Sequence, residues 1–452
     1  MGKSQDDVEG KRLIDVCGNG TSPLEQTLTP ARLLRPTWAE ISLSALRRNF
    51  ERIRELARSR RVMAVVKADA YGHGAVAVGR CLAGCGVDWF GVATVEEAVE
   101  LRQAGIEQPI LLLGGLYMSD PADLVEYRLT PSISSTARLD TYAECARRFQ
   151  RPIEFHLKVD TGLGRLGLPP SRLQLFLARY RELEGLELKG VFTHLASAED
   201  LIASQTDEQL ERFQTAVKEL PWYKVQPEWV HISNSAALLA RRDLPENLVR
   251  IGALLYGYCL PLILTPNGSS QSLDGGPRRT SAGPAAPADG EGPGERRDQR
   301  SLRRRAAASL ARLAEFEPVL TFKSRVVYLK DVPSNTPLGY GAGYHTRRPS
   351  RIATVPVGYA DGLSRALSNR GWAIVNDDYA RIVGSISMDL TLLDVTDIPG
   401  VEVGDEVILI GRSEHCSITA QEIASDLGTV PYEVLCSIGK RVPRIYVDED
   451  RG

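Results

Sequence analysis

Eight short apolar segments recur between residues 62 and 257, and this alternation restricts the fold more than any other feature of the sequence. Amphipathic stretches such as TVEEAVELRQAG (94–105) and TARLDTYAECARRF (136–149) lie between them, with apolar residues at helical spacing. Strands that alternate with helices in this way predict a parallel (β/α)8 barrel of the TIM type, in preference to an open doubly wound sheet. The expected strands are VMAVVK (62–67), WFGVAT (89–94), PILLLGG (109–115), TPSIS (130–134), IEFHLKVD (153–160), GVFTHLA (190–196), WVHISNS (229–235) and LVRIGALLYG (248–257).

The segments on either side of this pattern have a different composition. Residues 1–35 are polar and lack periodicity, so we expect a flexible N-terminal tail, and residues 36–262 would form the barrel. Between 265 and 305, 12 of 41 residues are Gly or Pro, eight are Arg and none is aromatic. Such a segment buries too little apolar surface to offset its ordering entropy. We therefore predict a disordered, low-complexity insertion over 263–316 that ends in a short helix (306–316), although its basic cluster could also bind an acidic partner.

Residues 317–452 predict a second domain that is mostly β. The runs VLTFKSRVVYL, RIATVPVGYA, WAIVNDDYARIVGSISMDLTLLDV and DEVILIG are strand-like and are bounded by Gly, Asp, Asn and Pro. One helix is expected within this domain, at 418–428. The strand expected at 37–43 is a candidate to pack with the same domain.

Composition limits the class of protein and its partners. The 55 Lys and Arg residues nearly balance the 57 Asp and Glu residues, so there is no electrostatic reason to expect nucleic acid or an anionic membrane as partner. The seven Cys are scattered and lack the spacing of a zinc site, which indicates thiols in a reducing compartment and no metal centre. No apolar run reaches the length of a membrane span and no signal peptide is recognisable, so we expect a soluble cytoplasmic protein.

Polar residues fall where the expected barrel strands end, which is where barrel enzymes place their chemistry. Each alone has an ordinary explanation, since a lysine after a strand is usually just solvated. Cations from several strands around one mouth suit an anionic ligand, and a serine with backbone N–H groups beside glycine suits phosphate. A lysine on the first strand of such a mouth suggests a Schiff base with pyridoxal phosphate, because a crowded cationic site lowers its pKa. These residues are Lys67, Lys158, Arg165, His194, Asn234, Ser235, Arg250 and Gly252.

Nine segments of the chain resemble the signatures of the alanine racemase family and occur in that family's order. The resemblance covers about 36–262 and 317–447. It implies a fold-type-III pyridoxal-phosphate enzyme that interconverts L- and D-alanine and supplies D-alanine for peptidoglycan. The segments are VVKADAYGHG, LKVDTGLGRLG, FTHLASAED, ISNSAA, RIGALLYG, GYGAGY, PVGYADGLSR, GSISMDLTLLDV and YEVLCSIGKRVPR.

The resemblance implies two catalytic bases. Lys67 matches the lysine that holds the cofactor and serves as one base, and Tyr340 in GYGAGY matches the second base, which family members place against the barrel of a partner subunit. The active site would then exist only in a homodimer. A tyrosine needs cationic neighbours to act near neutrality, and His194, matching the histidine beside the cofactor ring, is one candidate. Arg250 matches the arginine that faces the pyridine nitrogen. Because a guanidinium keeps its proton, it should weaken the ring as an electron sink.

Further residues match the family's contacts to cofactor and substrate. Arg165 matches an arginine near the cofactor's phenolic oxygen and the substrate, and Lys158 matches a lysine that is often carbamylated and paired with it. The two bare cations would repel, so we expect Lys158 to be carbamylated. The residues implied around the cofactor phosphate are Tyr71, Ser235, Gly252, Ala253 and Tyr359, with Asn234 beside them. Those implied at the substrate carboxylate are Met388 and Asp389, and those along the entrance channel are Arg365 and Tyr432.

Other enzymes and a carrier on related plans remain as alternatives. A racemase with broader choice, acting on serine or basic amino acids, would carry the same residues. A fold-type-III amino-acid decarboxylase would be expected to carry a Gly-triplet phosphate loop and a catalytic cysteine in the β domain, and neither Cys416 nor Cys436 has that context. A non-catalytic pyridoxal-phosphate carrier would lack the β domain.

Overall fold

The structure is a computed structural model and describes most of the chain. The predicted tail before residue 33 and the part of the predicted insertion before residue 307 lie outside the described residues. The described ranges are 33–117, 119–201, 204–241, 243–259 and 307–448.

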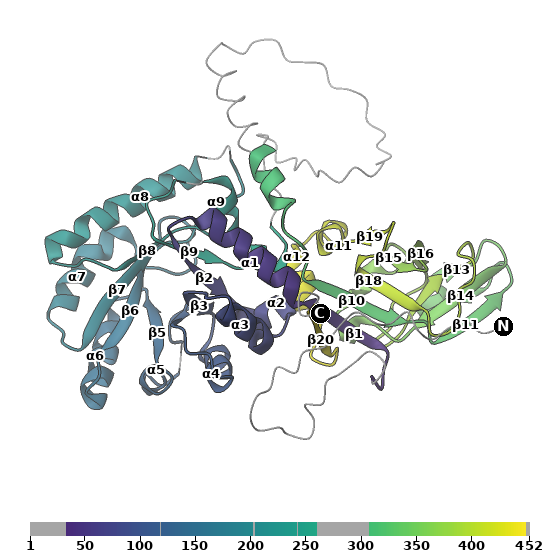
Figure 1. The fold of residues 1–452 in the computed structure, drawn as a ribbon, viewed down its shortest axis with the longest axis horizontal. Coiled ribbons are helices and arrows are strands. Elements are labelled where there is room, and N and C mark those ends of the chain that lie inside the picture. The colour runs from purple at the N-terminus through teal and green to yellow at the C-terminus, as the bar shows by residue number, and fades with distance from the viewer. Residues whose placement is uncertain (1–32, 118, 202–203, 242, 260–306, 449–452) are drawn as a thin grey trace, which may run out of the picture.

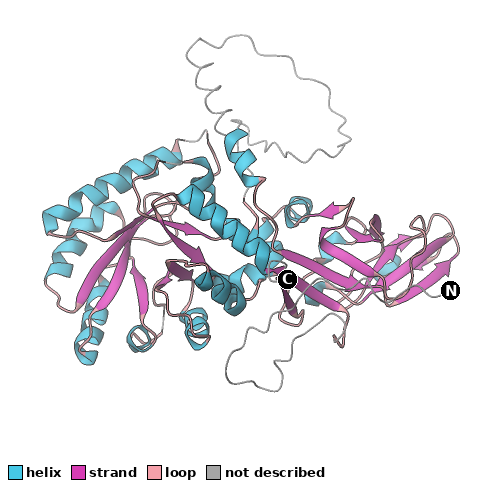
Figure 2. Cartoon of the chain, in the orientation of Figure 1, coloured by secondary structure: helices cyan, strands magenta, loops and turns pink. Residues whose placement is uncertain are grey.

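Eight parallel strands close into a barrel with helices on its outside (Figures 1 and 2). The last strand returns to the first, with Val249 paired to Val62 and Ile251 paired to Ala64. The predicted (β/α)8 barrel is confirmed, and each predicted strand overlaps an observed one. The barrel strands are β2 (Arg61–Val65), β3 (Trp89–Val92), β4 (Ile110–Leu112), β5 (Leu129–Ile133), β6 (Ile153–Lys158), β7 (Leu186–Phe192), β8 (Trp229–His231) and β9 (Leu248–Ile251).

Helices connect these strands, and their ends follow from capping residues. The predicted helix at 94–105 forms because Thr94 and Glu97 make a reciprocal capping box at its start. None of the described helices has both the length and the apolar character needed to cross a bilayer. The barrel helices and helical turns are α1 (Leu43–Ala57), α2 (Lys67–Gly72), α3 (Ala75–Gly84), α4 (Val95–Gln103), α5 (Ala122–Glu126), α6 (Ala137–Phe149), η2 (Pro170–Arg172), α7 (Leu173–Arg181), α8 (Gln205–Glu219), η3 (Leu220–Tyr223), α9 (Ser235–Ala240) and η4 (Ala253–Tyr256).

The second domain is built on a ten-stranded sheet, drawn on the right of Figure 1. Its main path runs β11-β14-β17-β16-β15-β18-β10-β1-β20, and β19 pairs with β18. The predicted helix at 418–428 is observed as α11 (Ala420–Leu427), and α12 (Pro431–Cys436) was not predicted. The strands that follow the barrel are β10 (Leu320–Arg325), β11 (Tyr328–Val332), β12 (Pro337–Leu338), β13 (Tyr344–His345), β14 (Ser350–Val355), β15 (Trp372–Val375), β16 (Asp378–Ile382), β17 (Thr391–Asp394), β18 (Glu406–Arg412), β19 (Ser417–Ile418) and β20 (Arg444–Val447).

The strand before the barrel belongs to this sheet. β1 (Thr37–Ser42) pairs antiparallel with β10 and parallel with β20, so both ends of the described chain meet in the β domain. From β1 the chain enters α1, in which the side chain of Asn49 is buried between the barrel and the second domain. Its amide donates to the carbonyls of Leu255 (3.0 Å) and Glu317 (2.8 Å), and its oxygen accepts from the Glu317 N–H (2.9 Å). One side chain therefore ties the end of the barrel to the start of the second domain.

The last turn of the barrel lies against the start of the second domain at a position that only glycine fits. Gly257 has a φ of +85°, and a Cβ there would lie 2.2 Å from the carbonyl oxygen of Glu317. Gly105 has nearly the same backbone, with a φ of +83°, but in the described structure nothing lies within 4 Å of its Cβ position. A comparison of the two glycines therefore separates the cost of a left-handed backbone from the cost of a steric clash at the Cβ position.

We predict that Gly257→Ala destabilises the chain much more than Gly105→Ala. In the Gly105 variant, alanine must adopt a left-handed backbone, which lowers the free energy of unfolding by about 1–2 kcal/mol. The Gly257 variant must also move the backbone at 317, so its free energy of unfolding should fall by more than about 3 kcal/mol. Melting temperatures of the two variants under the same conditions check this. Equal melting temperatures would mean that the close approach at the junction is not limiting.

Candidate active site

The C-terminal ends of the barrel strands surround a cavity of about 750 Å³. Its lining includes one acid, Glu199, and four basic side chains, Lys67, Lys158, Arg165 and Arg250. Excess positive charge at the mouth of a barrel suits an anionic ligand, as the sequence predicts. The predicted site residues that line this cavity are Lys67, Tyr71, Lys158, Arg165, His194, Asn234, Ser235, Arg250, Gly252, Ala253 and Tyr432.

Lys67 lies one residue beyond the end of β2 and begins a turn of unusual backbone. From Ala68 to Tyr71, four consecutive residues have φ between 52° and 55°, so α2 is largely a left-handed turn. None of the four is glycine, and left-handed backbone costs an L-residue about 1–2 kcal/mol. Such strain persists only where the surrounding structure holds it, and it clusters at functional sites.

Several contacts hold this strained turn in place. The Glu97 carboxylate accepts from the Ala68 N–H (2.6 Å), and the Asp69 carboxylate accepts from the first N–H of α3 (2.7 Å). Arg444, which begins β20, donates from Nε to the carbonyl of Gly72 (3.0 Å). The lysine turn is therefore fixed both by its own barrel and by the second domain.

The amines in the cavity are easier to deprotonate than free lysine. Burial, and next the charge of Arg165, lowers the pKa of Lys67. Burial, followed by the charges of Arg250, Arg165 and Lys67, lowers the pKa of Lys158 to about 8. Each amine therefore spends more time neutral, which is the form that reacts with carbonyl carbon.

Arg250 is a buried guanidinium whose donors are used inside the barrel. It donates from Nη2 to the carbonyls of Thr193 (2.7 Å) and Ile232 (3.0 Å), and its Nη1 lies 3.0 Å from His231 Nδ1. Burial lowers the pKa of Arg250 to about 10, so it still keeps its proton near neutrality. His231 Nε2 in turn lies 2.8 Å from Nδ1 of His156, deeper in the barrel.

His194, predicted as a candidate cationic neighbour of the tyrosine, lies in surroundings that disfavour a positive charge. Its Nδ1 lies 3.4 Å from Nη2 of Arg250. Burial, followed by the charges of Arg250, Lys158, Arg165 and Lys67, lowers the pKa of His194 to about 3. The imidazole is therefore neutral near pH 7 and cannot lower the pKa of a tyrosine by its charge.

Tyr71 and Gly252 lie against each other in the cavity wall. A Cβ at Gly252 would lie 2.5 Å from the Tyr71 hydroxyl oxygen, so a larger residue there would have to displace the Tyr71 side chain. The ring of Tyr71 packs on Tyr256 at 5.0 Å between centroids and edge-on against Tyr432 at 5.8 Å. Tyr432 belongs to α12, so the second domain supplies part of this wall.

Ser235 and Asn234 also line the cavity, but the Asn234 side chain already makes a hydrogen bond within the protein. The Asn234 side chain caps α9 by accepting from the Ala237 N–H (2.9 Å). The Ser235 hydroxyl accepts from the N–H of Leu254 (3.3 Å) and keeps its own proton available to donate. Ser235 is therefore better placed than Asn234 to bind a ligand oxygen.

The remaining predicted residues do not line the cavity of their own chain. Tyr340, Tyr359 and Met388 are 76%, 44% and 52% exposed, and all lie on the second domain. Tyr340 begins η5 (Tyr340–Ala342) and Tyr359 begins η6 (Tyr359–Asp361), while the predicted channel residue Arg365 begins η7 (Arg365–Leu367). The Tyr359 N–H donates to the Ser387 carbonyl (3.0 Å), so the turns that carry Tyr359 and Met388–Asp389 are neighbours.

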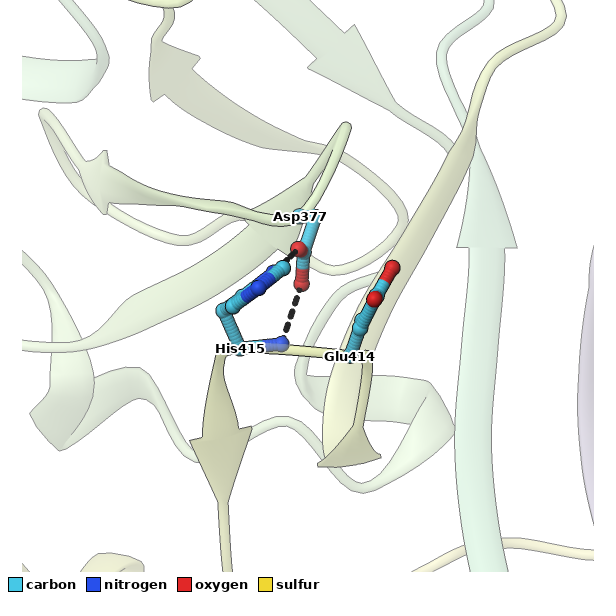
Figure 3. Close-up of side chains that lie close together, drawn as sticks. All are labelled: Asp377, Glu414 and His415. Atoms are coloured by element: carbon cyan, nitrogen blue, oxygen red, sulfur yellow. Dashed lines mark hydrogen bonds and ion pairs between the residues drawn. The ribbon is translucent and has the colours of Figure 1, made fainter.

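Away from the cavity, three possible metal-binding side chains lie close together in the described part of the chain (Figure 3). They are Asp377, Glu414 and His415, with ligand-type atoms within 4.8 Å of one another. Asp377 accepts from the N–H of His415 (2.8 Å), from the His415 ring and from the Ser413 hydroxyl. These hydrogen bonds hold the pKa of Asp377 well below its usual range. The carboxylate thus joins two turns of the β domain, which is a structural role.

The residues that sequence reasoning missed support the site from behind. His156 and His231 lie inside the barrel under Arg250, and Glu97 and Arg444 hold the lysine turn. Period-two alternation along β6 and β8 would place both histidines on the inside of the barrel, which is the one available signal. Arg444 ends the family-like segment YEVLCSIGKRVPR, but the local sequence does not show its partner Gly72, which is far away in the chain.

Both halves of the chain match known sequences. Residues 41–260 match the family model described as alanine racemase, N-terminal domain, and residues 319–446 match alanine racemase, C-terminal domain. The chain is 38% identical to alanine racemase 2 of Caldanaerobacter subterraneus subsp. tengcongensis, covering 92% of this chain and 95% of the relative. It is also 38% identical to alanine racemase of Halothermothrix orenii, covering 93% of this chain and 99% of the relative.

Solved structures agree with these matches. Alanine racemase from Clostridium difficile 630 has a TM-score of 0.77 at 33% identity and covers 92% of this chain and 97% of its own. The structure of alanine racemase from Bartonella henselae with covalently bound pyridoxal phosphate has a TM-score of 0.72 at 28% identity. The match covers 91% of this chain and 99% of that one. With both domains matched and relatives aligned over almost their whole length, this chain belongs to the alanine racemase family of isomerases.

Proposed function

We propose that this chain interconverts L- and D-alanine with pyridoxal phosphate in its barrel cavity, and that each active site takes residues from two copies of the chain. The observation that carries this proposal is the division of the family's two catalytic positions. Lys67 lines the cavity, whereas Tyr340 is largely exposed on the second domain of the same chain. A second copy that brings its Tyr340 to this cavity would complete the pair.

The residues of the cavity fit pyridoxal phosphate. The group needs an amine for its aldehyde, and burial lowers the pKa of the Lys67 amine as that role requires. It also needs hydrogen-bond donors close together for its phosphate. Because residue 252 has no Cβ, the Tyr71 hydroxyl can lie against the backbone of Gly252 and offer such a donor. The residues that would hold the group are Lys67 at the aldehyde, Arg165 and Arg250 at the ring, and Tyr71, Ser235, Gly252 and Ala253 at the phosphate, with Tyr359 reaching it from the second copy.

The chain's own residues have distinct tasks in the reaction. Pyridoxal phosphate, when bound, supplies a ring that withdraws electrons from the α-carbon of an attached amino acid. Arg250 would donate a hydrogen bond to the ring without giving up its proton, because its pKa of about 10 is well above neutral pH. His194 would stay neutral beside it. The site therefore keeps positive charge on its two arginines, Arg165 and Arg250, and the histidines around Arg250 add none.

Racemisation requires that a proton leave one face of the α-carbon and arrive on the other. Lys67 Nζ is one base, because its lowered pKa allows the neutral form. Tyr71 is a poor second base, because burial raises its pKa well above the usual value. Tyr340 Oη of a second copy is the better candidate for the opposite face. Tyr340, Tyr359 and Met388 are all exposed on the second domain, as expected of a face that another copy would cover.

The setting of the reaction follows from the family resemblance. We place the homodimer in the cytoplasm, where it would supply D-alanine for peptidoglycan. The same residues would also serve a racemase that acts on serine, so substrate choice is part of the test.

The direct test is incubation of the purified holoenzyme with each enantiomer of alanine, serine and lysine, followed by chiral chromatography. We expect alanine to racemise in both directions and faster than the other two. A cofactor-loaded chain that leaves alanine unchanged would contradict the proposal, and faster turnover of serine or lysine would indicate a broader-specificity racemase.

We predict that Tyr340→Phe lowers the rate of alanine racemisation roughly 10²–10⁴-fold, the scale of a positioned acid or base. The visible absorbance of bound cofactor should remain, because Lys67 still holds it. Tyr328→Phe is the matched control, since Tyr328 is another exposed tyrosine of the β domain. A Tyr340→Phe variant as active as the Tyr328→Phe variant would contradict the two-base assignment.

We predict that Lys158 carries a carbamate. Carbon dioxide reacts with the neutral amine and a proton is released, and a pKa of about 8 leaves more neutral amine than ordinary lysine has. At a fixed pressure of carbon dioxide, occupancy should therefore rise as the pH is raised from about 6 to about 8. Carbon NMR with labelled carbon dioxide would show a carbamate signal that disappears in Lys158→Arg. An intact-mass measurement that finds a bare amine at ambient carbon dioxide would contradict this.

A further inference from the structure

Arg441 joins two carboxylates on the β domain that have different surroundings. Its Nε donates to Oδ1 of Asp361 (2.7 Å), and its Nη2 donates to Oδ1 of Asp389 (2.6 Å). The Asp361 side chain is fully buried, whereas that of Asp389 is 58% exposed. Arg441 therefore connects a fixed anion to an anion on a surface turn.

Asp361 is the anchor of this pair. It also accepts from the Gly358 N–H (2.9 Å) and pairs with Nη2 of Arg35 (2.7 Å), just before β1. Burial alone would raise the pKa of Asp361, but the hydrogen bonds from Arg35, Gly358 and Arg441 outweigh it and leave the pKa lowered. The carboxylate is charged and its position is set from three directions.

The backbone of the turn around Met388 is held tightly, without help from Arg441. The N–H groups of Tyr359 and Ala360 donate to the carbonyls of Ser387 (3.0 Å) and Met388 (3.1 Å). A Cβ at Gly358 would lie 2.3 Å from the Ser387 oxygen, so the two turns touch through backbone atoms. The Asp389 carboxylate differs, since Arg441 is its one charged partner among the described residues.

We infer that Arg441 is a positioning residue of the racemase, which neutralises and orients Asp389 so that the Met388–Asp389 turn can accept the carboxylate of the substrate. This inference rests on the proposed function and on the family resemblance, which implies that this turn of a second copy meets the substrate carboxylate. An unpaired Asp389 would repel that carboxylate, and like charges at close range weaken binding. Arg441 removes the repulsion by pairing with Asp389 from its anchored place on Asp361.

The test compares the steady-state kinetics of alanine racemisation by Arg441→Gln and Arg35→Gln holoenzymes. Both variants lose hydrogen bonding to Asp361, but only Arg441 reaches Asp389. We expect Arg441→Gln to raise KM for alanine about tenfold, with kcat changed less than about threefold, and added salt to reduce the effect. Arg35→Gln should leave KM within about twofold of the wild type, whatever it does to the melting temperature.

A second change distinguishes charge from structure. In the Arg441→Gln background, Asp389→Asn should return KM toward the wild-type value, because it removes the repelling charge. Arg441→Lys keeps the charge but reaches the two acids less well, so its KM should fall between those of the wild type and Arg441→Gln. If Arg441→Gln does not fold, a KM for Arg441→Lys above that of Arg35→Gln supports the inference, and an equal KM overturns it.

The outcomes separate this inference from the proposed function. A wild-type holoenzyme that does not racemise alanine would overturn both. An active wild type with equal KM values for the Arg441→Gln and Arg35→Gln variants would overturn the role of Arg441 alone, and so would an effect confined to kcat.

Discussion

The left-handed turn after β2 is the constraint on which the rest of the structure depends. It sets the position of Lys67 and Tyr71, yet four of its residues have a backbone that L-amino acids avoid. The barrel contributes Glu97 to hold this turn, and the second domain contributes Arg444 and the backbone of α12, where a Cβ at Gly72 would lie 2.5 Å from the Leu435 oxygen. The β domain is thus part of what makes the barrel lysine usable, and the pairing of β1 with β10 and β20 keeps the two domains together.

Burial and the crowding of like charges then determine the protonation state of each basic group in the cavity. Lys67 and Lys158 lose part of their affinity for protons, His194 becomes neutral, and Arg250 stays charged because a guanidinium begins from a much higher pKa. A single cluster can therefore offer reactive amines and a permanent cation side by side. The hydrogen bonds of Arg250 to Thr193, Ile232 and His231 fix the cation within the barrel.

Much of the fold and many of the residues that line the cavity could be predicted from the sequence, and the limits have physical causes. The eight barrel strands were predictable because each is an apolar run followed by a helix, and Lys67, Arg165 and Arg250 lie at or just beyond strand ends. The left-handed turn was not predictable, because Ala68–Tyr71 contains neither Gly nor Asn and tertiary contacts impose its backbone. The lowered pKa of His194 was not predictable, because burial, which no local pattern reveals, is its main cause. The separation of Tyr340 from the cavity depends on how the domains are placed in space.

The central claim is that each active site combines Lys67 from one copy of the chain with Tyr340 from another. Mixing Lys67→Ala with Tyr340→Phe under conditions that exchange subunits tests it most directly, because a mixed dimer holds one site with both residues intact. Random exchange of equal amounts should restore about a quarter of the wild-type activity, since half of the dimers would be mixed and each would have one working site. Subunit exchange shown by mass, with no activity above that of the separate variants, would contradict the account.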